Sequence, residues 1–261
     1  MKQRKSAANT PPTEGFLRAI TLVRERVKDP GSYPYTIPAI RSLDTLPFHT
    51  RVTFLVGENG SGKSTLIEAI ALLLGYNAEG GTKNFHFATH HSESELYRAL
   101  RPVRGARRER NGFFLRAESY FNVATEVDRL GVGGSYGGKS LHEQSHGESF
   151  LALVEHRFGI EGLYLLDEPE AALSPARQMR FLGHLHALAT RGRSQFIIAT
   201  HSPILLAYPD ALIYELNDEG MHTVHYEETD HYRLTRDFLL HRERFFRELF
   251  KEDAEASEGG T

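Results

Sequence analysis

The sequence contains no cysteine, so a disulfide framework, a thiol nucleophile and a cysteine-containing zinc site are all excluded. Long apolar runs are also missing, because stretches such as residues 69–74 fall far short of the ~20 residues that span a bilayer. The polar residues 1–10 lack the apolar run of a signal peptide. We therefore expect a cytoplasmic protein without a membrane-spanning segment.

Neither sign of charge is in large excess. The chain has 31 Lys and Arg residues and 34 Asp and Glu residues, which gives a formal net charge of −3. This balance offers no overall electrostatic reason to bind nucleic acid and leaves only a local basic patch for such a contact. Five arginines between positions 101 and 110 form a candidate patch, although a solvated hairpin explains them equally well.

The chain has enough apolar residues to build a sizeable core. Of its 261 residues, 40% are hydrophobic and 25% are charged, which suits one α/β domain and argues against global disorder. We expect a flexible tail over residues 1–15, one domain over residues 16–250 and an acidic tail over residues 251–261. No internal repeat and no sustained heptad pattern occurs in the sequence.

Strand and helix signals alternate along the chain. Runs rich in β-branched and apolar residues predict strands at residues 20–23, 51–56, 113–117, 163–166 and 195–199. Apolar periodicity and end signals predict helices at residues 64–74, 148–158, 175–190 and 232–250. Residues 211–216 and 221–226 flank an Asn-Asp-Glu-Gly turn and predict a hairpin. Residues 76–111 are polar and weakly patterned, and they predict no regular element.

The strongest functional signal is the sequence GENGSGKST at residues 57–65. It matches G-x-x-x-x-G-K-[ST], follows a predicted strand and opens a predicted helix. Glycines let successive backbone N–H groups point at phosphate oxygens, and the helix directs its positive end at the same charge. We expect Lys63 to reach the β and γ phosphates of a nucleotide and the Ser64 hydroxyl to bind Mg²⁺.

The candidate nucleotide-binding residues of this loop are Gly57, Asn59, Gly60, Ser61, Gly62, Lys63, Ser64 and Thr65. The alternative is a glycine-rich turn that contains a lysine by chance, and the correct elements on both flanks argue against it. A phosphate-binding loop alone indicates a nucleotide and no particular reaction, so a second motif has to decide the class.

That second motif is an apolar strand that ends in two carboxylates, LYLLDEPE at residues 163–170. The carboxyl ends of parallel strands line the ligand crevice of an α/β sheet, so Asp167 is expected beside Mg²⁺. Glu168 is one residue further on and is a candidate base for an attacking water. An ordinary strand-to-helix boundary would also place acidic residues here, and only the pairing with the glycine loop favours function.

Together with AALSP at residues 171–175 and the later Thr200-His201-Ser202, these motifs resemble an ABC-class ATPase. The resemblance implies a P-loop α/β fold with a mainly parallel central sheet flanked by helices, and an antiparallel β subdomain. It implies ATP and Mg²⁺ as ligands and a role for His201 at the γ-phosphate. It also implies an ATP-dependent homodimer, in which Ser145 of one chain faces Lys63 of the other.

The segment QSHGES at residues 144–149 is similar to the signature loop of this class, with His146 in place of a glycine. Ser145 and the Gly147 N–H are then candidate γ-phosphate ligands at the start of a helix. Ser145 with Glu148 also forms a capping box, and both interpretations can hold together.

Within the class, the chain resembles small stand-alone bacterial AAA-type ATPases, which are related to chromosome-maintenance and recombination ATPases but lack coiled-coil arms. The stretch FFLRAESYF at residues 113–121 carries this likeness and has no Q-loop glutamine, so Glu118 is a candidate substitute or a plain surface charge. The expected function is that of an ATPase, which hydrolyses ATP and acts on a protein or DNA client. The alternatives are a nucleotide-binding subunit of a membrane transporter and a non-catalytic, ATP-dependent interaction module.

Other residues carry weaker signals. Tyr33 and Tyr35 precede the glycine loop and are candidates for stacking on adenine, but packing in the core is at least as good an explanation. The chain has 14 histidines, among them His86, His90 and His91, and no carboxylate pattern near these three supports a metal site.

Overall fold

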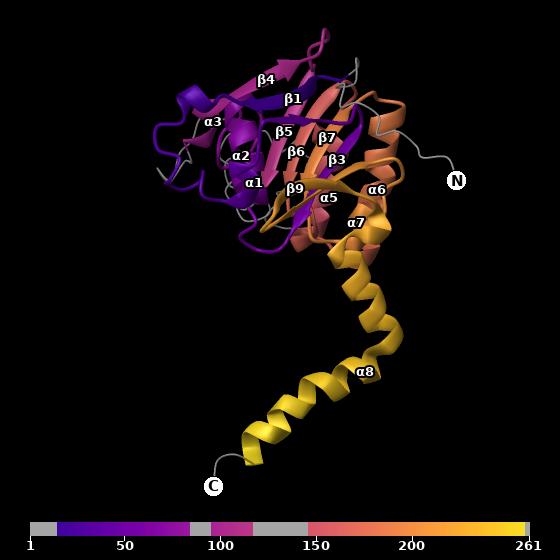
Figure 1. Ribbon diagram of the computed structural model, residues 1–261. Helices are drawn as coiled ribbons and strands as arrows, with labels where there is room; N and C mark the ends of the chain where they lie inside the picture. The colour runs from indigo at the N-terminus through magenta and orange to yellow at the C-terminus, as the bar shows by residue number, and fades with distance from the viewer. Residues whose placement is uncertain (1–14, 84–94, 117–145, 259–261) are drawn as a thin grey trace, which may run out of the picture.

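The computed structural model describes residues 15–83, 95–116 and 146–258. Its centre is a six-stranded sheet with the order β5-β6-β7-β3-β8-β9 (Figure 1). The strands are β3 (Val52–Gly57), β5 (Asn111–Arg116), β6 (Gly162–Asp167), β7 (Gln195–Ala199), β8 (Leu212–Asn217) and β9 (Gly220–Val224). All neighbouring pairs are parallel except the β8–β9 hairpin. The predicted mainly parallel sheet is therefore confirmed.

The central strands are buried along their whole length because helices cover both faces of the sheet. Every residue of β3, β6 and β7 is buried. Residues such as Phe54 and Ile198 face one core, whereas Leu55 and Ile197 face the other. Continuous apolar runs without polar alternation are what a sheet covered on two sides requires.

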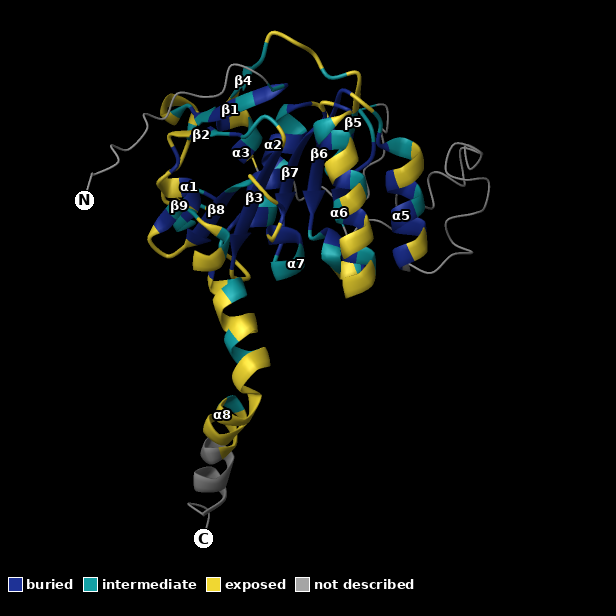
Figure 2. Cartoon of the chain, turned by 90° about the vertical axis from the view of Figure 1, so that its right-hand side faces the viewer, coloured by how far each residue is buried: buried dark blue, intermediate teal, exposed yellow. Residues whose placement is uncertain are grey.

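The helices divide between the two faces. The first core packs against α5 (His146–Arg157), α6 (Pro175–Thr190) and α7 (Pro203–Leu206), which line one side of the sheet in Figure 2. The second core packs against α1 (Pro38–Arg41), α2 (Lys63–Leu73) and α3 (Leu96–Ala99). Short 3₁₀ turns lie at η1 (Arg24–Arg26), η4 (Pro169–Ala172) and η5 (Tyr226–Glu228).

A three-stranded antiparallel sheet lies on the α2 side of the molecule. Its order is β2-β1-β4, with β1 (Leu17–Leu22), β2 (Thr45–Pro47) and β4 (Leu100–Arg104). This sheet is the antiparallel subdomain that was predicted. β4 and α3 lie within residues 76–111, for which the sequence predicts no element. Their apolar residues form only two short groups, which are too short to predict a strand or a helix.

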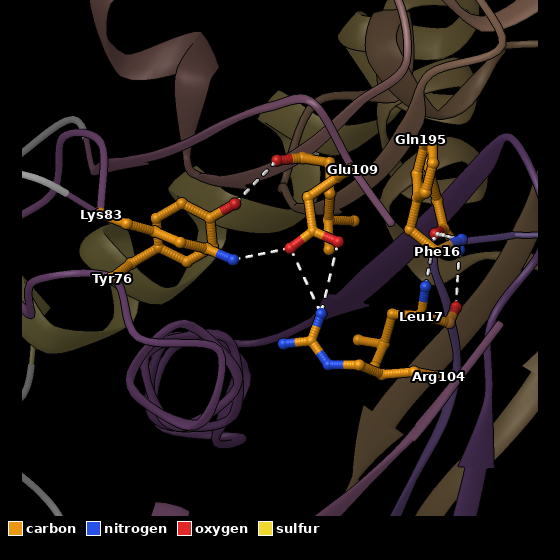
Figure 3. A network of polar contacts seen from close by, with 8 residues as sticks. Phe16, Leu17, Tyr76, Lys83, Arg104, Glu109 and Gln195 are labelled. Carbon is orange, nitrogen blue, oxygen red and sulfur yellow. Dashed lines mark hydrogen bonds and ion pairs between the residues drawn. The ribbon is translucent and has the colours of Figure 1, made fainter. Parts of the chain in front are cut away.

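One buried amide joins the two sheets (Figure 3). Gln195 begins β7, and its Oε1 accepts hydrogen bonds from the backbone N–H groups of Phe16 and Leu17, each at 3.0 Å. Its Nε2 donates to the carbonyl of Leu17 at 2.8 Å, as Figure 3 shows, and to the carbonyl of His49 at 2.9 Å. The side chain is fully buried. It therefore satisfies four backbone groups where the end of β1 meets the central sheet.

The last described element is the long helix α8 (Asp230–Glu258), which extends away from the body of the molecule (Figures 1 and 2). It is kinked at His241, whose φ of −132° is not helical. The helix starts two residues before the expected position and continues past residue 250. Six large apolar side chains on it are exposed: Leu234, Leu239, Leu240, Phe246, Leu249 and Phe250. Among the described residues, no helix has the length and apolar character needed to cross a membrane.

Candidate functional site

Three neighbouring strands bring the predicted motifs to one edge of the central sheet. The loop at residues 57–65 follows β3, Asp167 ends β6, and His201 comes two residues after β7. β7 pairs with both β6 and β3, and Ala199 is the register partner of Asp167 on one side and of Leu55 on the other. Carboxyl ends of parallel strands share an edge, so segments far apart in the sequence converge here.

The glycine loop has the backbone that a phosphate cradle needs. Gly60 and Gly62 have φ values of +84° and +100°, in the left-handed region. A Cβ on Gly57 would lie 2.2 Å from the Leu216 carbonyl oxygen, and one on Gly62 would lie 2.9 Å from Ile37 Cγ2. The Ser61 Oγ is buried without a hydrogen-bond partner. The loop therefore has no room for side chains at two glycines and retains an unsatisfied buried hydroxyl.

Lys63 is the cation at the end of this glycine loop. It opens α2, is only 3% exposed, and its Nζ donates to the carbonyls of Gly57 at 2.7 Å and Glu58 at 3.0 Å. Burial lowers the pKa of this ammonium, while nearby carboxylates, Glu168 foremost, partly oppose that shift. An anionic ligand in the loop would stabilise the charged form of the lysine.

Ser64 and Asp167, the two residues predicted to bind Mg²⁺, are in contact with each other. The Ser64 Oγ donates to Asp167 Oδ1 at 3.1 Å. On the other side of this carboxylate, Arg116 Nε lies 3.6 Å from Asp167 Oδ2, and Arg116 Nη1 contacts Glu68 at 2.6 Å. A hydroxyl beside a carboxylate is a donor set that suits Mg²⁺. The sequence did not single out Arg116, whose place beside Asp167 follows from the β5–β6 register.

Glu168 and His201 lie together next to this pair. Glu168 has a left-handed backbone, with φ at +51°, which is uncommon for a residue with a side chain. His201 Nε2 lies 3.3 Å from Glu168 Oε1, within ion-pair distance, but the two atoms are not aligned as a hydrogen bond. Burial, followed by the charge of Lys63, lowers the pKa of His201. This shift favours the neutral form of the imidazole.

Two further side chains fix His201, and sequence reasoning missed the role of both. Glu170 Oε1 accepts a hydrogen bond from the His201 backbone N–H at 2.5 Å. His231, in the first turn of α8, places its Nε2 3.0 Å from His201 Nδ1. Glu170 lies within the acidic motif, but the sequence predicts roles only for the two preceding carboxylates. His231 is 30 residues from His201, and no local pattern marks it.

Other residues of the loop at residues 57–65 line a neighbouring cavity or contact a tyrosine. Asn59, Gly60 and Ser61 line a cavity of about 260 Å³ that also includes Asp218 and His231. Thr65 Oγ1 hydrogen-bonds Tyr33 Oη at 2.9 Å. Tyr33 is 66% exposed beside the cradle. Tyr35, in contrast, packs against the α2-side core, so its ring is a packing aromatic.

Not every candidate residue joins this group. Gly147 is buried in the first turn of α5, where an added Cβ would lie 2.6 Å from Arg177 Nη1 and 2.9 Å from the Ala172 carbonyl oxygen. α5 belongs to the core on the opposite face of the sheet from α2. Ser145, Glu118, His86, His90 and His91 lie outside the described residues.

The arginines of the candidate basic patch are largely paired with carboxylates. Arg104 contacts Glu109 at 3.2 Å, and Glu109 also accepts from Lys83 at 2.6 Å (Figure 3). Glu161, the residue before β6, contacts Arg107 at 2.5 Å and Arg110 at 2.9 Å. Much of the positive charge of the patch is thus compensated within the fold.

Two protein-family models match the chain over separate segments. One, described as "AAA domain", matches residues 34–123, which include the cradle. The other, described as "AAA domain, putative AbiEii toxin, Type IV TA system", matches residues 141–207, which include Asp167, Glu168 and His201. No curated protein matches the chain.

Solved structures similar to the chain include an SMC head domain and a component of an ABC transporter complex. The SMC head domain from Thermotoga maritima is 20% identical, with a TM-score of 0.44, and the match covers 80% of this chain and 98% of that one. The cbiO1 protein from Clostridium perfringens, part of the ABC transporter complex cbiONQ, is 15% identical, with a TM-score of 0.48, and the match covers 87% of this chain and 96% of that one.

The cradle, the acidic end of β6 and the histidine after β7 occupy adjacent strand ends of a parallel sheet. The two AAA-domain matches divide the same motifs between them. A glycine loop between a strand and a helix, followed by an acidic strand end, is the arrangement of P-loop nucleotide hydrolases. The chain therefore has the motifs of a P-loop nucleotide hydrolase on a mainly parallel α/β sheet, and two of its segments match AAA-domain models.

Proposed function

We propose that this chain binds ATP with Mg²⁺ in the loop at residues 57–65 and hydrolyses the bond to the γ-phosphate. The observation that carries the proposal is the convergence of Lys63, Ser64, Asp167, Glu168 and His201 at one sheet edge. Each supplies a part that phosphoryl transfer needs, namely a cation, two metal ligands, a base and a hydrogen-bond donor.

The cradle holds the phosphates. Lys63 exchanges its two carbonyl contacts for the β and γ phosphate oxygens, and the N–H groups of the glycine loop surround the same charge. Ser64 and Asp167 hold Mg²⁺, which when bound neutralises charge on the phosphate oxygens. Arg116 stays next to Asp167 and limits the net negative charge of the pair.

Glu168 accepts the proton of the attacking water, and His201 donates a hydrogen bond to the γ-phosphate. A side chain acting as base has to lie within hydrogen-bond reach of the water that it activates. Glu168 is 37% exposed and sits at the strand end beside the metal ligands, so water can reach it. His201 lies at ion-pair distance from the same carboxylate, so both groups face one reacting centre.

The proposal includes an ATP-dependent homodimer that acts on a protein or DNA client. Gly147 lies in the first turn of α5, which packs on the face of the sheet opposite to α2. A second copy, turned head to tail, would bring Ser145 and Gly147 over the first chain's cradle. The tight packing around Gly147 is consistent with a closely fitted backbone at that position.

Replacing the cradle lysine tests the proposal. We expect Lys63→Ala to lose at least about 100-fold in affinity for ATP, since charge-assisted hydrogen bonds to phosphate contribute about 1.5–3 kcal/mol each. Lys28→Ala is the matched control, because Lys28 is 77% exposed and pairs with the surface carboxylate of Glu95. Calorimetric titration with ATP and Mg²⁺ measures both variants. Tight ATP binding by Lys63→Ala would contradict the proposal.

A further inference from the structure

His231 is the side chain that joins the C-terminal helix to the nucleotide site. Its Nε2 lies 3.0 Å from Nδ1 of His201, and the two ring centroids are 5.1 Å apart at an angle of 50°. The rings are tilted and not stacked in parallel, and the short distance makes the contact a hydrogen bond between ring nitrogens. The other nitrogen of His201 faces Glu168.

A neutral imidazole has one N–H, so its two nitrogens cannot both donate. A carboxylate such as Glu168 only accepts hydrogen bonds, and so does a phosphate oxygen. For His201 to donate a hydrogen bond toward Glu168 or a phosphate oxygen, its Nε2 must carry the proton. Its Nδ1 is then a hydrogen-bond acceptor. The Nε2–H group of His231 is in position to donate to it.

We propose that His231 is a positioning residue that fixes His201 in the Nε2–H tautomer, with the donor directed at the γ-phosphate. The inference rests on the proposed function for the role of His201 in hydrolysis. The tautomer itself is a property of the ligand-free chain. His231 therefore acts on the reaction through His201 and contacts no nucleotide in this scheme.

The first turn of α8 is anchored so that His231 keeps its place. The Asp230 N–H donates to Glu215 Oε1 on β8 at 3.1 Å. The buried Thr229 donates through its hydroxyl to the Tyr226 carbonyl at 2.8 Å and accepts from the Tyr232 N–H at 3.4 Å.

From the other side, Glu170 holds the backbone of His201. Both partners of the imidazole pair are thus fixed by groups outside the pair.

The hydrogen bond between His201 and His231 matters for the tautomer of His201 because both rings have buried nitrogen atoms. His231 Nδ1 and His201 Nε2 are buried atoms without an aligned hydrogen bond, so the Nδ1–Nε2 contact is the hydrogen bond that the pair makes. Burial and Lys63 lower the pKa of His201, which disfavours the doubly protonated ring. With a single proton to place, the partner at Nδ1 determines which nitrogen carries it.

Three substitutions separate this role from simple packing. His231→Gln keeps an N–H donor, His231→Leu removes all polar atoms, and His231→Glu offers only an acceptor when it is ionised. His156→Leu is the control, because His156 is an exposed histidine on α5. Nuclear magnetic resonance of the full chain with ¹⁵N-labelled histidine reports which nitrogen of His201 carries the proton, and the missing signal in His201→Gln identifies it.

We expect the Nε2–H form of His201 in the wild type, in His231→Gln and in His156→Leu, and a shift toward Nδ1–H in His231→Glu. For ATP hydrolysis, kcat should fall about 10–100-fold in His231→Leu and His231→Glu, the usual scale for losing the group that orients a histidine. KM for ATP should change less than about threefold, and His231→Gln should restore most of kcat.

The two readouts can fail separately. An Nδ1–H tautomer in the wild type, or the same tautomer in all three variants, would overturn the role of His231. Equal kcat values for His231→Gln, His231→Leu and His231→Glu would overturn it as well. If the tautomer shifts as expected but the wild type does not hydrolyse ATP, the positioning of His201 stands and the proposed function is wrong.

Discussion

At the scale of single residues, Glu170 is a carboxylate in an unfavourable environment. One of its oxygens accepts from the His201 N–H, and the other is buried without a partner. Burial is the main cause that raises the pKa of this carboxyl. A raised pKa means that the folded protein binds the proton more tightly than the unfolded chain does. The contribution of this carboxyl to the free energy of unfolding is therefore fully present below its unfolded-state pKa. That contribution is lost as the pH rises through its folded-state pKa.

Glu170→Gln removes the ionisation and keeps an acceptor for the His201 N–H. We expect the variant to melt about 2–4 °C above the wild type at neutral pH, which corresponds to about 1 kcal/mol in a chain of this size. The difference should shrink as the pH falls below the ordinary range for glutamic acid. Thermal melts between pH 4 and pH 8, with the exposed Glu25→Gln as control, measure it. A variant that melts below the wild type at neutral pH would contradict the burial argument.

Residues within contiguous motifs were predictable, and residues brought in by the fold were not. Lys63, Asp167, Glu168 and His201 each belong to a short pattern whose chemistry needs those residue types. Arg116 and His231 reach the site from strands and helices far along the chain, through the β5–β6 register and the first turn of α8. The sequence has no local signal for such contacts, because they arise only when the sheet is assembled.

At the scale of elements, Gln195 shows how one side chain fixes the relation between two sheets. Gln195→Leu keeps a similar volume but removes the partner of four backbone hydrogen bonds. Unsatisfied buried groups cost about 1–3 kcal/mol each, so we expect the free energy of unfolding to fall by about 3 kcal/mol or more. Urea unfolding measures the midpoint, and His156→Leu controls for an added apolar side chain. An unchanged midpoint would show that the junction does not depend on the amide.

The elements that were predicted well are those with long, consistent patterns. The helix at residues 175–190 and the strand at residues 195–199 have the bounds expected from the sequence. β4 escaped prediction because its residues Leu100–Arg104 alternate poorly and include a proline. α8 continues past residue 250 because acidic residues with good helix propensity follow the last apolar position, and the composition of that segment had suggested a tail.

At the scale of the whole molecule, the proposed dimer predicts that ATP joins two chains when hydrolysis is blocked. Glu168→Gln should accumulate as a dimer with ATP and Mg²⁺ and remain a monomer without them. Adding Ser145→Arg should prevent that dimer while leaving ATP binding to the monomer intact, since Ser145 serves only the opposite site. Light scattering after gel filtration measures the mass. A monomer at saturating ATP in the Glu168→Gln variant would contradict the head-to-tail arrangement.

The most direct measurement of the central claim is the rate of phosphate release from ATP by the wild type and by Glu168→Gln. The amide has nearly the shape of the carboxylate but cannot take the proton of the attacking water. We predict Mg²⁺-dependent turnover by the wild type and by Glu25→Gln. In Glu168→Gln, turnover should be lower by about 100-fold or more while the affinity for ATP is retained. Near-normal turnover in Glu168→Gln would contradict the assignment of Glu168 as the base.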